Sequence, residues 1–521
     1  MFDFESKNFL TANTYRYLIL GVILVSAVFL AFYGSGKSLW ADEAYSVFIA
    51  RLDFSDALRE LSVDTHPPFY YFLLTLWVKL FGHEEHALRL LSTIFYFASI
   101  FLVYCLAKEL YDRETGYLAS FLYLLSPLAT WSAHSVRMYS LLGFLCVSST
   151  YFFIKIFLGE SQSKIVFWGC IFINACGILT HVWFFFFCFS QALIYLSLFF
   201  PKQFSRALKI SVLSFLPFTV LWGSIFLGQL GNAAVDWIDP PSIKDLFVIF
   251  LGYFGEKIAY IAYSLMSVLL FSSSSFRRAF KQYAGAGFFT KLFGDKRRMM
   301  FLTIMFGTLV VPFIISQVKP IFGGTRFNIV SLHAFILLVA PLLCKYVNRT
   351  VLIIGCTLLL AICGTALVKY YNRDAICSEK LFVKSLIAHS RTGDAIIFTG
   401  ASRTVMEYYL EKFGAEKNYR TFTFPKENDF HRGYFSVSKP LDKRAELDLE
   451  AENLVQTINQ NLPPTNKIWF TDGNAAQINE ILKRKLENDF QKIGQIDDVC
   501  RGVFSPDFDV SYTGILEYGK P

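Results

Sequence analysis

Long apolar runs dominate the first 370 residues of the chain, and short polar segments separate them. A helix needs about 20 mostly apolar residues to cross the hydrocarbon core of a bilayer. Runs that approach or exceed this length lie at 17–33, 89–107, 117–130, 138–158, 165–180, 182–200, 209–228, 246–273, 300–318, 327–344 and 350–370. The pattern therefore predicts a multi-pass α-helical membrane protein with about 11–13 transmembrane helices.

Two segments near the N-terminus have a different pattern. The apolar run Phe69–Phe81 has only 13 residues and carries Lys79, which favours a re-entrant or interfacial helix, with a full crossing as the alternative. Between Tyr45 and Leu61, apolar and charged positions alternate at helical spacing. This predicts a helix that lies along the membrane interface, inside a first outer loop at 34–68.

The composition changes after Tyr371, where mixed polar sequence replaces the apolar runs. Two strand-like and two helix-like segments alternate there: 395–398, 403–413, 467–470 and 475–490. They predict a small α/β soluble domain at 371–521 that follows a membrane domain at 1–370. Its glycines lack the spacing of a phosphate loop, so we expect an accessory domain without a nucleotide site.

The amino-acid composition supports a membrane setting. Hydrophobic residues make up 54% of the chain and charged residues 17%, against roughly 25% charged residues in an average soluble domain. The net charge of +8 is spread over short loops and forms no basic face interleaved with aromatic residues. Nucleic acid is therefore not an expected partner.

Lys and Arg in the loops give the predicted helices a direction, because both residues accumulate on the cytoplasmic side. The most basic loop, 274–299, is placed inside. Counting crossings from it places four further loops inside: 108–116, 155–164, 201–209 and 345–349. The outer face then holds 34–68, 131–137, 229–245, 319–326 and everything after 370. We expect a plasma (inner) membrane protein with an extracytoplasmic C-terminal domain.

Two of the ten cysteines, Cys377 and Cys500, lie in the predicted soluble domain. On an oxidising outer side they form either a disulfide that joins the two ends of the domain or two unpaired thiols, and the sequence favours neither. No pair of cysteines has the CxxC spacing of a metal site.

Two adjacent carboxylates, Asp42 and Glu43, follow the first apolar run. Charges at the membrane interface are costly when they are desolvated, so they are commonly functional. The alternative is helix capping, because Asp42 suits an N-cap and Glu43 suits a first helical turn. On this pair alone the two interpretations have similar weight.

A second polar cluster precedes the short run at 69–81 and contains Asp64, His66 and, after two prolines, Tyr70. The prolines force an extended backbone before a helix begins. A lone His66 is more often structural than functional. With Asp64 beside it and Asp42 on the same predicted face, a substrate-binding role gains weight.

Several cations also fall on the predicted outer face, where positive-inside bias argues against them. They are Arg137, Lys319 and Arg326; Tyr139 lies two residues after the first of them, and His181 lies at the outer end of the 165–180 helix. A single outer Arg is explained by snorkelling to lipid headgroups, whereas this set is typical of a phosphate clamp. A carboxylate that takes a proton, together with cations that hold a phosphate, is what a reaction on a lipid phosphate requires.

These motifs resemble those of the GT-C glycosyltransferases, in the protein mannosyltransferase-like and aminoarabinose transferase-like branch that uses polyprenyl-phosphate sugars. The matching stretches are WADEAYS (40–46), DTHPPFYY (64–71), SPLATWSAHSVRMYS (126–140), GILTHVWFFFFCFSQALIY (177–195) and GGTRFNIVSLHAFILLVAP (323–341). The resemblance covers residues 17 to about 345. It implies that Asp42, with Glu43 as its neighbour, is the catalytic base, and that Arg137 and Arg326 face the lipid phosphate.

Two positions depart from the family pattern. Many relatives carry an acidic residue two positions before the Arg of the RMY motif, where this chain has Ser135. This departure is compatible with a changed substrate or with lost activity. The tyrosine that often follows the TH motif is replaced by Val182.

The sequence therefore predicts an inverting glycosyltransferase that moves a sugar from a polyprenyl-phosphate donor to a hydroxyl or amine of a glycan, lipid or protein acceptor. It requires no cofactor, and a divalent cation that bridges carboxylate and phosphate is compatible with it. One alternative is a transporter or flippase of a lipid-linked or anionic substrate, for which internal repeats and mid-membrane ionisable groups are expected. The other is a catalytically inactive family member.

Overall fold

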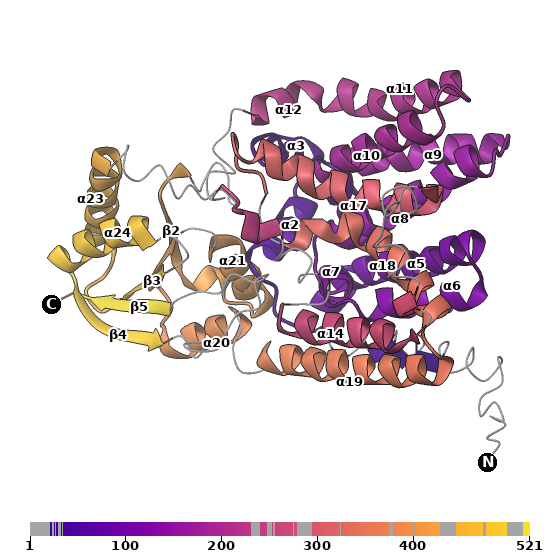
Figure 1. Cartoon of the computed structure of the whole chain (residues 1–521). Coiled ribbons are helices and arrows are strands. Elements are labelled where there is room, and N and C mark those ends of the chain that lie inside the picture. Colours follow the sequence, from indigo (N-terminus) through magenta and orange to yellow (C-terminus); the bar gives the residue numbers. More distant parts are fainter. Residues whose placement is uncertain are drawn as a thin grey trace, which may run out of the picture.

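A computed structural model of the chain describes residues 21, 22, 25, 26, 28, 29, 33, 35–230, 240–246, 253, 256–274, 276–278, 294–322, 325–374, 379–399, 402–427, 444–472, 476–497 and 514–520. Helices form one large bundle, and a small α/β domain lies at one end of it (Figure 1). The predicted combination of a helical membrane domain and a C-terminal α/β domain is confirmed. Most of the predicted first helix at 17–33, together with Cys377 and Cys500, lies outside the described residues.

Five helical segments among the described residues are long and apolar enough to cross a membrane. They contain α5 (Glu85–Leu110), α8 (Tyr139–Phe153) with the π-helix η1 (Ile154–Leu158), α11 (Phe204–Leu221), α17 (Lys296–Ile315) and α18 (Ile329–Tyr346). The bundle is completed by α4 (Phe69–Phe81), α6 (Arg113–Leu125), α7 (Pro127–Ala133), α9 (Lys164–Ile178), α10 (Trp183–Leu198), α12 (Gly223–Gln229), α14 (Glu256–Ser272) and α19 (Arg349–Asp374). Large apolar side chains such as Ile165, Phe172 and Val220 are exposed on its surface, as lipid-facing residues are. The chain is a multi-pass membrane protein.

Two predicted runs are each divided between two helices. The run at 117–130 is broken between α6 and α7, because Pro127 has no backbone N–H and Ser126 accepts a hydrogen bond from Ala129 N at 3.4 Å as the N-cap of α7. The run at 209–228 is broken at Trp222, between α11 and α12. The prediction of one continuous helix was wrong at both places.

The predicted single interfacial helix at Tyr45–Leu61 is also two helices, α2 (Ala41–Arg51) and α3 (Phe54–Val63). Asp53 has an extended backbone and begins the second of them. Most side chains of α2 are buried, because this helix packs between α4 and the C-terminal domain rather than along the membrane surface. α2 is therefore an internal element that presents its first turn to the bundle.

Helix α4 begins and ends at the same end of the bundle. At its start, Phe69 N donates to Leu179 O, at the end of α9, over 3.0 Å. Just after its end, His83 O accepts a hydrogen bond from Tyr408 of the C-terminal domain at 2.8 Å. Since α5 starts next to that contact, the structure supports the re-entrant or interfacial interpretation of α4.

The C-terminal domain is a five-stranded sheet with helices on its faces, in the order β2-β1-β3-β5-β4. β1 is parallel to β2 and β3, while β5 is antiparallel to β3 and β4. The strands are β1 (Ala395–Thr399), β2 (Arg420–Phe424), β3 (Ile468–Asp472), β4 (Gln491–Asp497) and β5 (Gly514–Gly519); the helices are α20 (Glu379–His389), α21 (Ser402–Lys412), α23 (Arg444–Asn461) and α24 (Ala476–Asp489). The four predicted segments correspond to β1, α21, β3 and α24.

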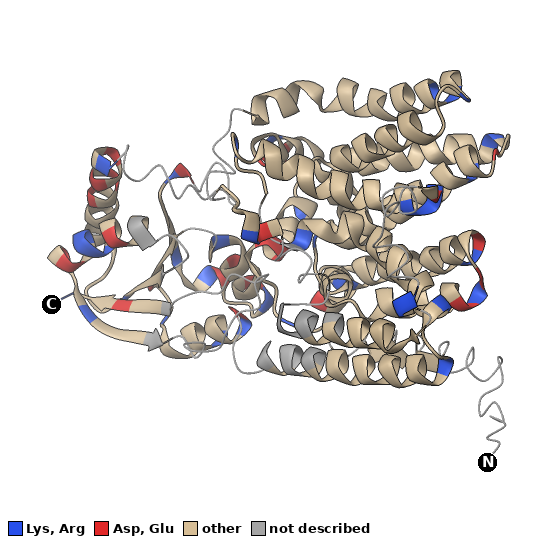
Figure 2. Cartoon of the chain, viewed as in Figure 1, with Lys and Arg blue, Asp and Glu red and all other residues tan. Residues whose placement is uncertain are grey.

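The basic loops lie together at the end of the bundle opposite the C-terminal domain (Figure 2). Ion pairs and hydrogen bonds join them: Lys155 with Glu109, Arg206 with Ser161, Arg349 with Glu114, and Arg297 with the carbonyl of Leu110. The described parts of the loops that were predicted to share one side of the membrane therefore lie at one end of the helices, while residues 275 and 279–293 of the 274–299 loop lie outside the described residues.

Candidate active site

The two adjacent carboxylates of α2 point in different directions. Glu43 is buried, and one of its oxygens accepts from Arg89 Nη2 at 2.8 Å and from Trp40 N at 3.3 Å. Its other oxygen accepts from Val136 N at 2.8 Å. Both oxygens of Glu43 are thus occupied by the protein, which leaves Asp42 as the carboxylate available to a ligand.

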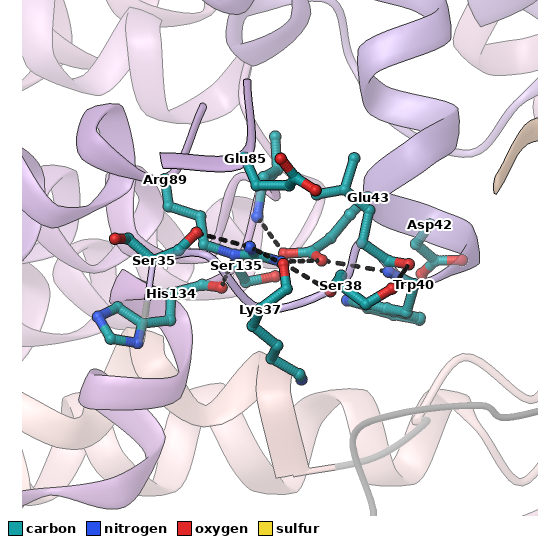
Figure 3. A network of polar contacts seen from close by, with 12 residues as sticks. Ser35, Lys37, Ser38, Trp40, Asp42, Glu43, Glu85, Arg89, His134 and Ser135 are labelled. Atoms are coloured by element: carbon teal, nitrogen blue, oxygen red, sulfur yellow. Dashed lines mark hydrogen bonds and ion pairs between the residues drawn. The ribbon is translucent and has the colours of Figure 1, made fainter. Parts of the chain in front are cut away.

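Arg89, near the start of α5, holds the segment before α2 in place (Figure 3). Its side chain is completely buried, and it donates to Ser35 O at 2.9 Å, Ser38 O at 3.0 Å and His134 O at 2.9 Å, as well as to Lys37 O. The guanidinium therefore ties the 35–38 segment, α2 and the end of α7 together. Arg89 is not among the predicted site residues, although the sequence contains a signal for it: a charged residue at the edge of an apolar run is costly unless it is paired.

Asp42 lies between the two arginines that were predicted to hold a phosphate. Its carboxylate is 3.8 Å from Arg137 Nη2 and 3.5 Å from Arg326 Nη1. The Asp42 side chain is 37% exposed, whereas those of Arg137 and Arg326 are 4% and 17% exposed. A carboxylate open to solvent thus lies between two largely enclosed cations.

Arg137 joins the first polar cluster to the second. Its Nη1 donates to Ser46 Oγ and to Tyr71 Oη, each at 3.2 Å, and its Nη2 is 3.5 Å from His66 Nε2. His66 Nδ1 is in turn 3.2 Å from a carboxylate oxygen of Asp64. Residues from two other motifs, 40–46 and 64–71, therefore surround the guanidinium group of Arg137.

The electrostatic surroundings keep Arg137 charged. Burial opposes the charge, but Tyr71 and Asp42 outweigh this effect, and the pKa of Arg137 lies above its ordinary value. The Nε atom of Arg137 is buried and has no hydrogen-bond partner among the described residues. An unused donor on a buried cation is suited to an anionic ligand.

Aromatic rings form a wall beside the cations. The Tyr139 ring lies 6.1 Å from the His181 ring and 5.9 Å from the Arg326 guanidinium carbon, and the Phe327 ring is 5.2 Å from His181. Trp40 lies 6.0 Å from the same guanidinium carbon. This wall covers one side of the site and limits the access of water to Arg326.

His181 is neutral and oriented. Burial, followed by electrostatic interactions with His66 and Arg137, lowers the pKa of His181 well below its ordinary value. Its Nδ1 accepts from Trp183 N at 3.0 Å, so the proton of the neutral ring is on Nε2. That Nε2 atom is buried and has no partner among the described residues, so it is a second available donor.

Seven of the ten predicted site residues lie in this one cluster: Asp42, Asp64, His66, Arg137, Tyr139, His181 and Arg326. Glu43 points into the protein, and Lys319 donates to Leu230 O at the end of α12 instead. Tyr70 is buried beside Tyr71, and it is Tyr71, which was not predicted, that contacts Arg137. Tyr70 and Tyr71 are adjacent in the sequence, and only the rotation of α4 decides which of the two hydroxyls faces Arg137.

Ser135, where many relatives carry an acidic residue, is buried, and its carbonyl accepts a hydrogen bond from Ser92 at 2.7 Å. Within the described parts of the chain, no group of three or more His, Cys, Asp or Glu side chains is arranged to hold a metal ion. His66 Nδ1 lies 3.2 Å from an Asp64 carboxylate oxygen, so these two side chains form a pair and not a group of three.

Comparisons with known proteins identify the class of this fold. Residues 65–222 match the family model of the dolichyl-phosphate-mannose-protein mannosyltransferases. No protein with curated annotation matches the sequence. The fold is similar to the crystal structure of ArnT from Cupriavidus metallidurans in the apo state, with a TM-score of 0.51 and 11% identity over 97% of this chain and 98% of that chain.

The fold is also similar to the arabinofuranosyltransferase AftD from Mycobacteria, with a TM-score of 0.56 and 15% identity over 97% of this chain and 40% of AftD. At these identities the structural likeness shows the fold alone. The protein is a multi-pass membrane protein with a glycosyltransferase fold. The family match over residues 65–222 and these two likenesses in fold agree with the resemblance to GT-C glycosyltransferases.

Proposed function

We propose that the protein transfers a sugar, with inversion, from a polyprenyl-phosphate donor to a hydroxyl or amine of an acceptor glycan, lipid or protein. The observation that carries the proposal is the position of Asp42, 3.5 Å from Arg326 and 3.8 Å from Arg137. This arrangement brings a proton acceptor next to two cations that fit a phosphate.

In the proposed reaction Asp42 takes the proton from the acceptor as the acceptor oxygen or nitrogen forms a bond to the anomeric carbon of the sugar. The bond between that carbon and the phosphate oxygen breaks, and the oxygen leaves with the electron pair. Attack occurs on the face opposite the phosphate, which inverts the anomeric centre. Arg137 and Arg326 stabilise the negative charge that develops on the leaving phosphate.

The buried donors at the site support this division of roles. Arg137 Nε and His181 Nε2 have no partner among the described residues, and both belong to the cluster around Asp42. Phosphate oxygens are strong acceptors for such donors. His181, being neutral, donates a hydrogen bond there without a charge of its own.

We further propose that the site and the C-terminal domain face the outer side of a plasma membrane. The support is that the basic loops gather at the opposite end of the bundle, and such loops accumulate on the cytoplasmic side. A lipid-linked donor embedded in the outer leaflet would then present its phosphate to the arginines at the level of α2.

The distribution of charge favours a transferase over a transporter. Lys, Arg, Asp and Glu residues concentrate at the two ends of the helices in the described part of the bundle (Figure 2). A transporter is expected to place ionisable groups and interrupted helices near the middle of the membrane. The charged residues of this site instead lie on α2, on the loops that follow α3 and α7, and on η3 (Thr325–Asn328).

The test of the proposal is transfer by purified protein in liposomes that contain a polyprenyl-phosphate sugar. Asp42→Asn is expected to lower transfer by at least a thousandfold, because no proton acceptor remains, while the protein still inserts and unfolds at the wild-type temperature. The matched control is Asp53→Asn, which alters an exposed carboxylate of the same outer segment and is expected to leave transfer unchanged.

Mass spectrometry of surface glycans and of lipids, from cells with and without the gene, identifies the substrates for that assay. Loss of one glycan modification together with accumulation of one polyprenyl-phosphate sugar is expected. Near-normal transfer by Asp42→Asn would remove Asp42 from the mechanism. No change in glycans or lipid-linked sugars would favour the inactive-member alternative that Ser135 suggests.

A further inference from the structure

The C-terminal domain is packed onto the helix that carries Asp42. Buried residues of α20 and α21, including Leu386, Met406 and Tyr409, belong to the same apolar core as the bundle, whereas the sheet has a second core with α23 and α24. Thr404 Oγ1 donates to Ala41 O at 3.5 Å, in the first turn of α2. The first half of this domain is therefore built into the membrane domain.

Tyr409 is the centre of this contact. Its hydroxyl accepts a hydrogen bond from Leu39 N at 2.7 Å and lies 3.4 Å from Glu85 Oε1. Burial, followed by the charge of Glu85, raises the pKa of Tyr409 well above its ordinary value, so the phenol keeps the proton that it donates to Glu85. One hydroxyl group thus joins the backbone three residues before Asp42 to the first turn of α5.

Glu85 is held by two lysines of the C-terminal domain. Lys380 Nζ lies 3.2 Å from its carboxylate, and Lys412 Nζ contacts its other oxygen and also Glu84, the latter at 2.5 Å. The Glu85 side chain is only 3% exposed, so its contacts with the two lysines are shielded from solvent at the carboxylate, whereas Glu84 is 66% exposed. Figure 3 shows Glu85 on the same helix as Arg89, which binds Glu43.

We infer that Tyr409 is a positioning residue for catalysis, which sets the distance of Asp42 from Arg137 and Arg326. The inference rests on the proposed function. Leu39 is followed directly by Trp40, the N-cap of α2, so a shift of the Leu39 backbone moves the first turn and Asp42 with it. The same hydroxyl donates to Glu85 at the start of α5. The C-terminal domain therefore fixes the position of α2 relative to α5 as well as relative to the domain itself.

Two reasons make the effect specific to the position of Asp42. Glu43 is anchored by Arg89 and Val136, which fixes one side of the first turn of α2. Among the described residues, the Asp42 carboxylate has only its ion pairs with Arg326 and Arg137, at 3.5 and 3.8 Å. Tyr409 supplies the additional constraint from outside the membrane domain.

The test is Tyr409→Phe, which removes the hydroxyl and keeps the ring that stacks 6.0 Å from Phe413. We expect kcat to fall about 10- to 100-fold, because misplacement of a reacting group by a fraction of an ångström to 1 Å has this effect. KM for the lipid donor is expected to change less than threefold, because Arg137 and Arg326 are untouched.

The matched control is Tyr408→Phe, one residue earlier on α21. Tyr408 donates to His83 O at 2.8 Å and makes no hydrogen bond to α2 among the described residues. We expect a similar decrease in the unfolding temperature for both variants but wild-type kcat for Tyr408→Phe. Equal kcat losses in the two variants would overturn the inference, because they would reflect a general weakening of the interface.

A second measurement is independent of transfer. Asp42→Cys is labelled with a charged maleimide in the wild-type and Tyr409→Phe backgrounds, and the labelling rate of that peptide is followed by mass spectrometry. We expect a rate at least threefold different in the Tyr409→Phe background. If wild-type protein transfers no sugar but the labelling rates differ, the proposed function fails and the positioning role stands; equal rates with equal kcat overturn the positioning role.

Discussion

Two neighbouring groups of charges meet at the first turn of α2 and have different surroundings. Glu43 and Arg89 are completely enclosed, and the described contacts of both side chains end on backbone groups or on each other. Asp42 is 37% exposed, its arginines are 3.5 and 3.8 Å away, and Arg137 Nε is unused among the described residues. The first group is saturated by the protein, and the second has capacity left for a ligand.

The difference shows how adjacent carboxylates acquire separate roles. A buried ion pair is tolerated only when hydrogen bonds satisfy its remaining donors and acceptors, which the Glu43 and Arg89 network does. A site that binds and releases a charged substrate requires donors that are incompletely used in its absence. Exposure and hydrogen-bond saturation therefore separate the anchor from the candidate site more clearly than charge does.

The largest loss of stability is expected from Arg89→Lys, which weakens the buried network of Glu43 and Arg89, here called the anchor. Arg89 donates to five acceptors, which are the Glu43 carboxylate and the carbonyls of Ser35, Lys37, Ser38 and His134. Lysine keeps the charge but has three donors and no planar fork, so at least two of these five acceptors lose the hydrogen bond that Arg89 gives them. At about 1–3 kcal/mol for each unsatisfied group, we expect a loss of about 3–5 kcal/mol. The thermal unfolding temperature in detergent and the yield of monodisperse protein measure it. Wild-type stability would contradict the anchor role.

The corresponding substitution in the candidate site, Arg137→Lys, is expected to lower transfer and to leave stability nearly unchanged. The buried charge beside Asp42 remains, so the unfolding temperature should change little. Transfer should fall about 10- to 100-fold, because one planar set of donors to the developing phosphate charge is replaced by a point charge. Steady-state kinetics in liposomes, paired with thermal unfolding, measure both quantities. A large stability loss with normal transfer would show that Arg137 belongs to the anchor instead.

The smallest effect is expected at the far end of α2, where Arg51 and Glu411 form two hydrogen bonds of 2.7 Å. Hydrogen bonding by Arg51 lowers the pKa of Glu411 below its ordinary value of 4.5. The stabilisation is therefore fully present above about pH 4.5 and is lost as the pH falls through the lowered pKa. Because both side chains are more than one third exposed, solvent screening reduces it to about a few tenths of a kcal/mol.

Glu411→Gln measures this contribution. The difference between the unfolding temperatures of wild type and variant should be small at pH 7 and should diminish as the pH falls below about 4.5. Glu416→Gln serves as the control, since Glu416 is exposed and makes no ion pair with a described residue. A difference that grows on acidification would contradict the assigned sign.

The residues of the site could largely be predicted from the sequence, but their roles could not. Asp42, Arg137 and Arg326 are far apart in the chain, and the motif resemblance was sufficient to group them. Glu43 and Lys319 carry the same types of charge as true members of the cluster, and no local pattern distinguishes them. Tyr70 and Tyr71 are adjacent, so only the rotation of α4 decides which hydroxyl reaches Arg137.

The helices of the bundle also have some features that the sequence predicts and others that it does not. Apolar runs predicted the existence of most helices, because the length and hydropathy of a spanning helix are local properties. The break between α6 and α7 depends on Ser126 and Pro127, and their effect is visible in the sequence. The burial of α2 is not visible there, because it depends on the residues of α4 and α21 that cover it.

The sequence by itself determined that the chain crosses a membrane repeatedly, that its basic loops share one side, and that carboxylates and arginines meet at the other. These properties follow from composition and from the spacing of apolar residues. Only the tertiary structure decided that Asp42 faces the two arginines while Glu43 faces Arg89, and that Tyr409 of the C-terminal domain contacts the start of α2. Such choices depend on ångström-scale distances between segments up to 370 residues apart in the chain, which local sequence does not contain.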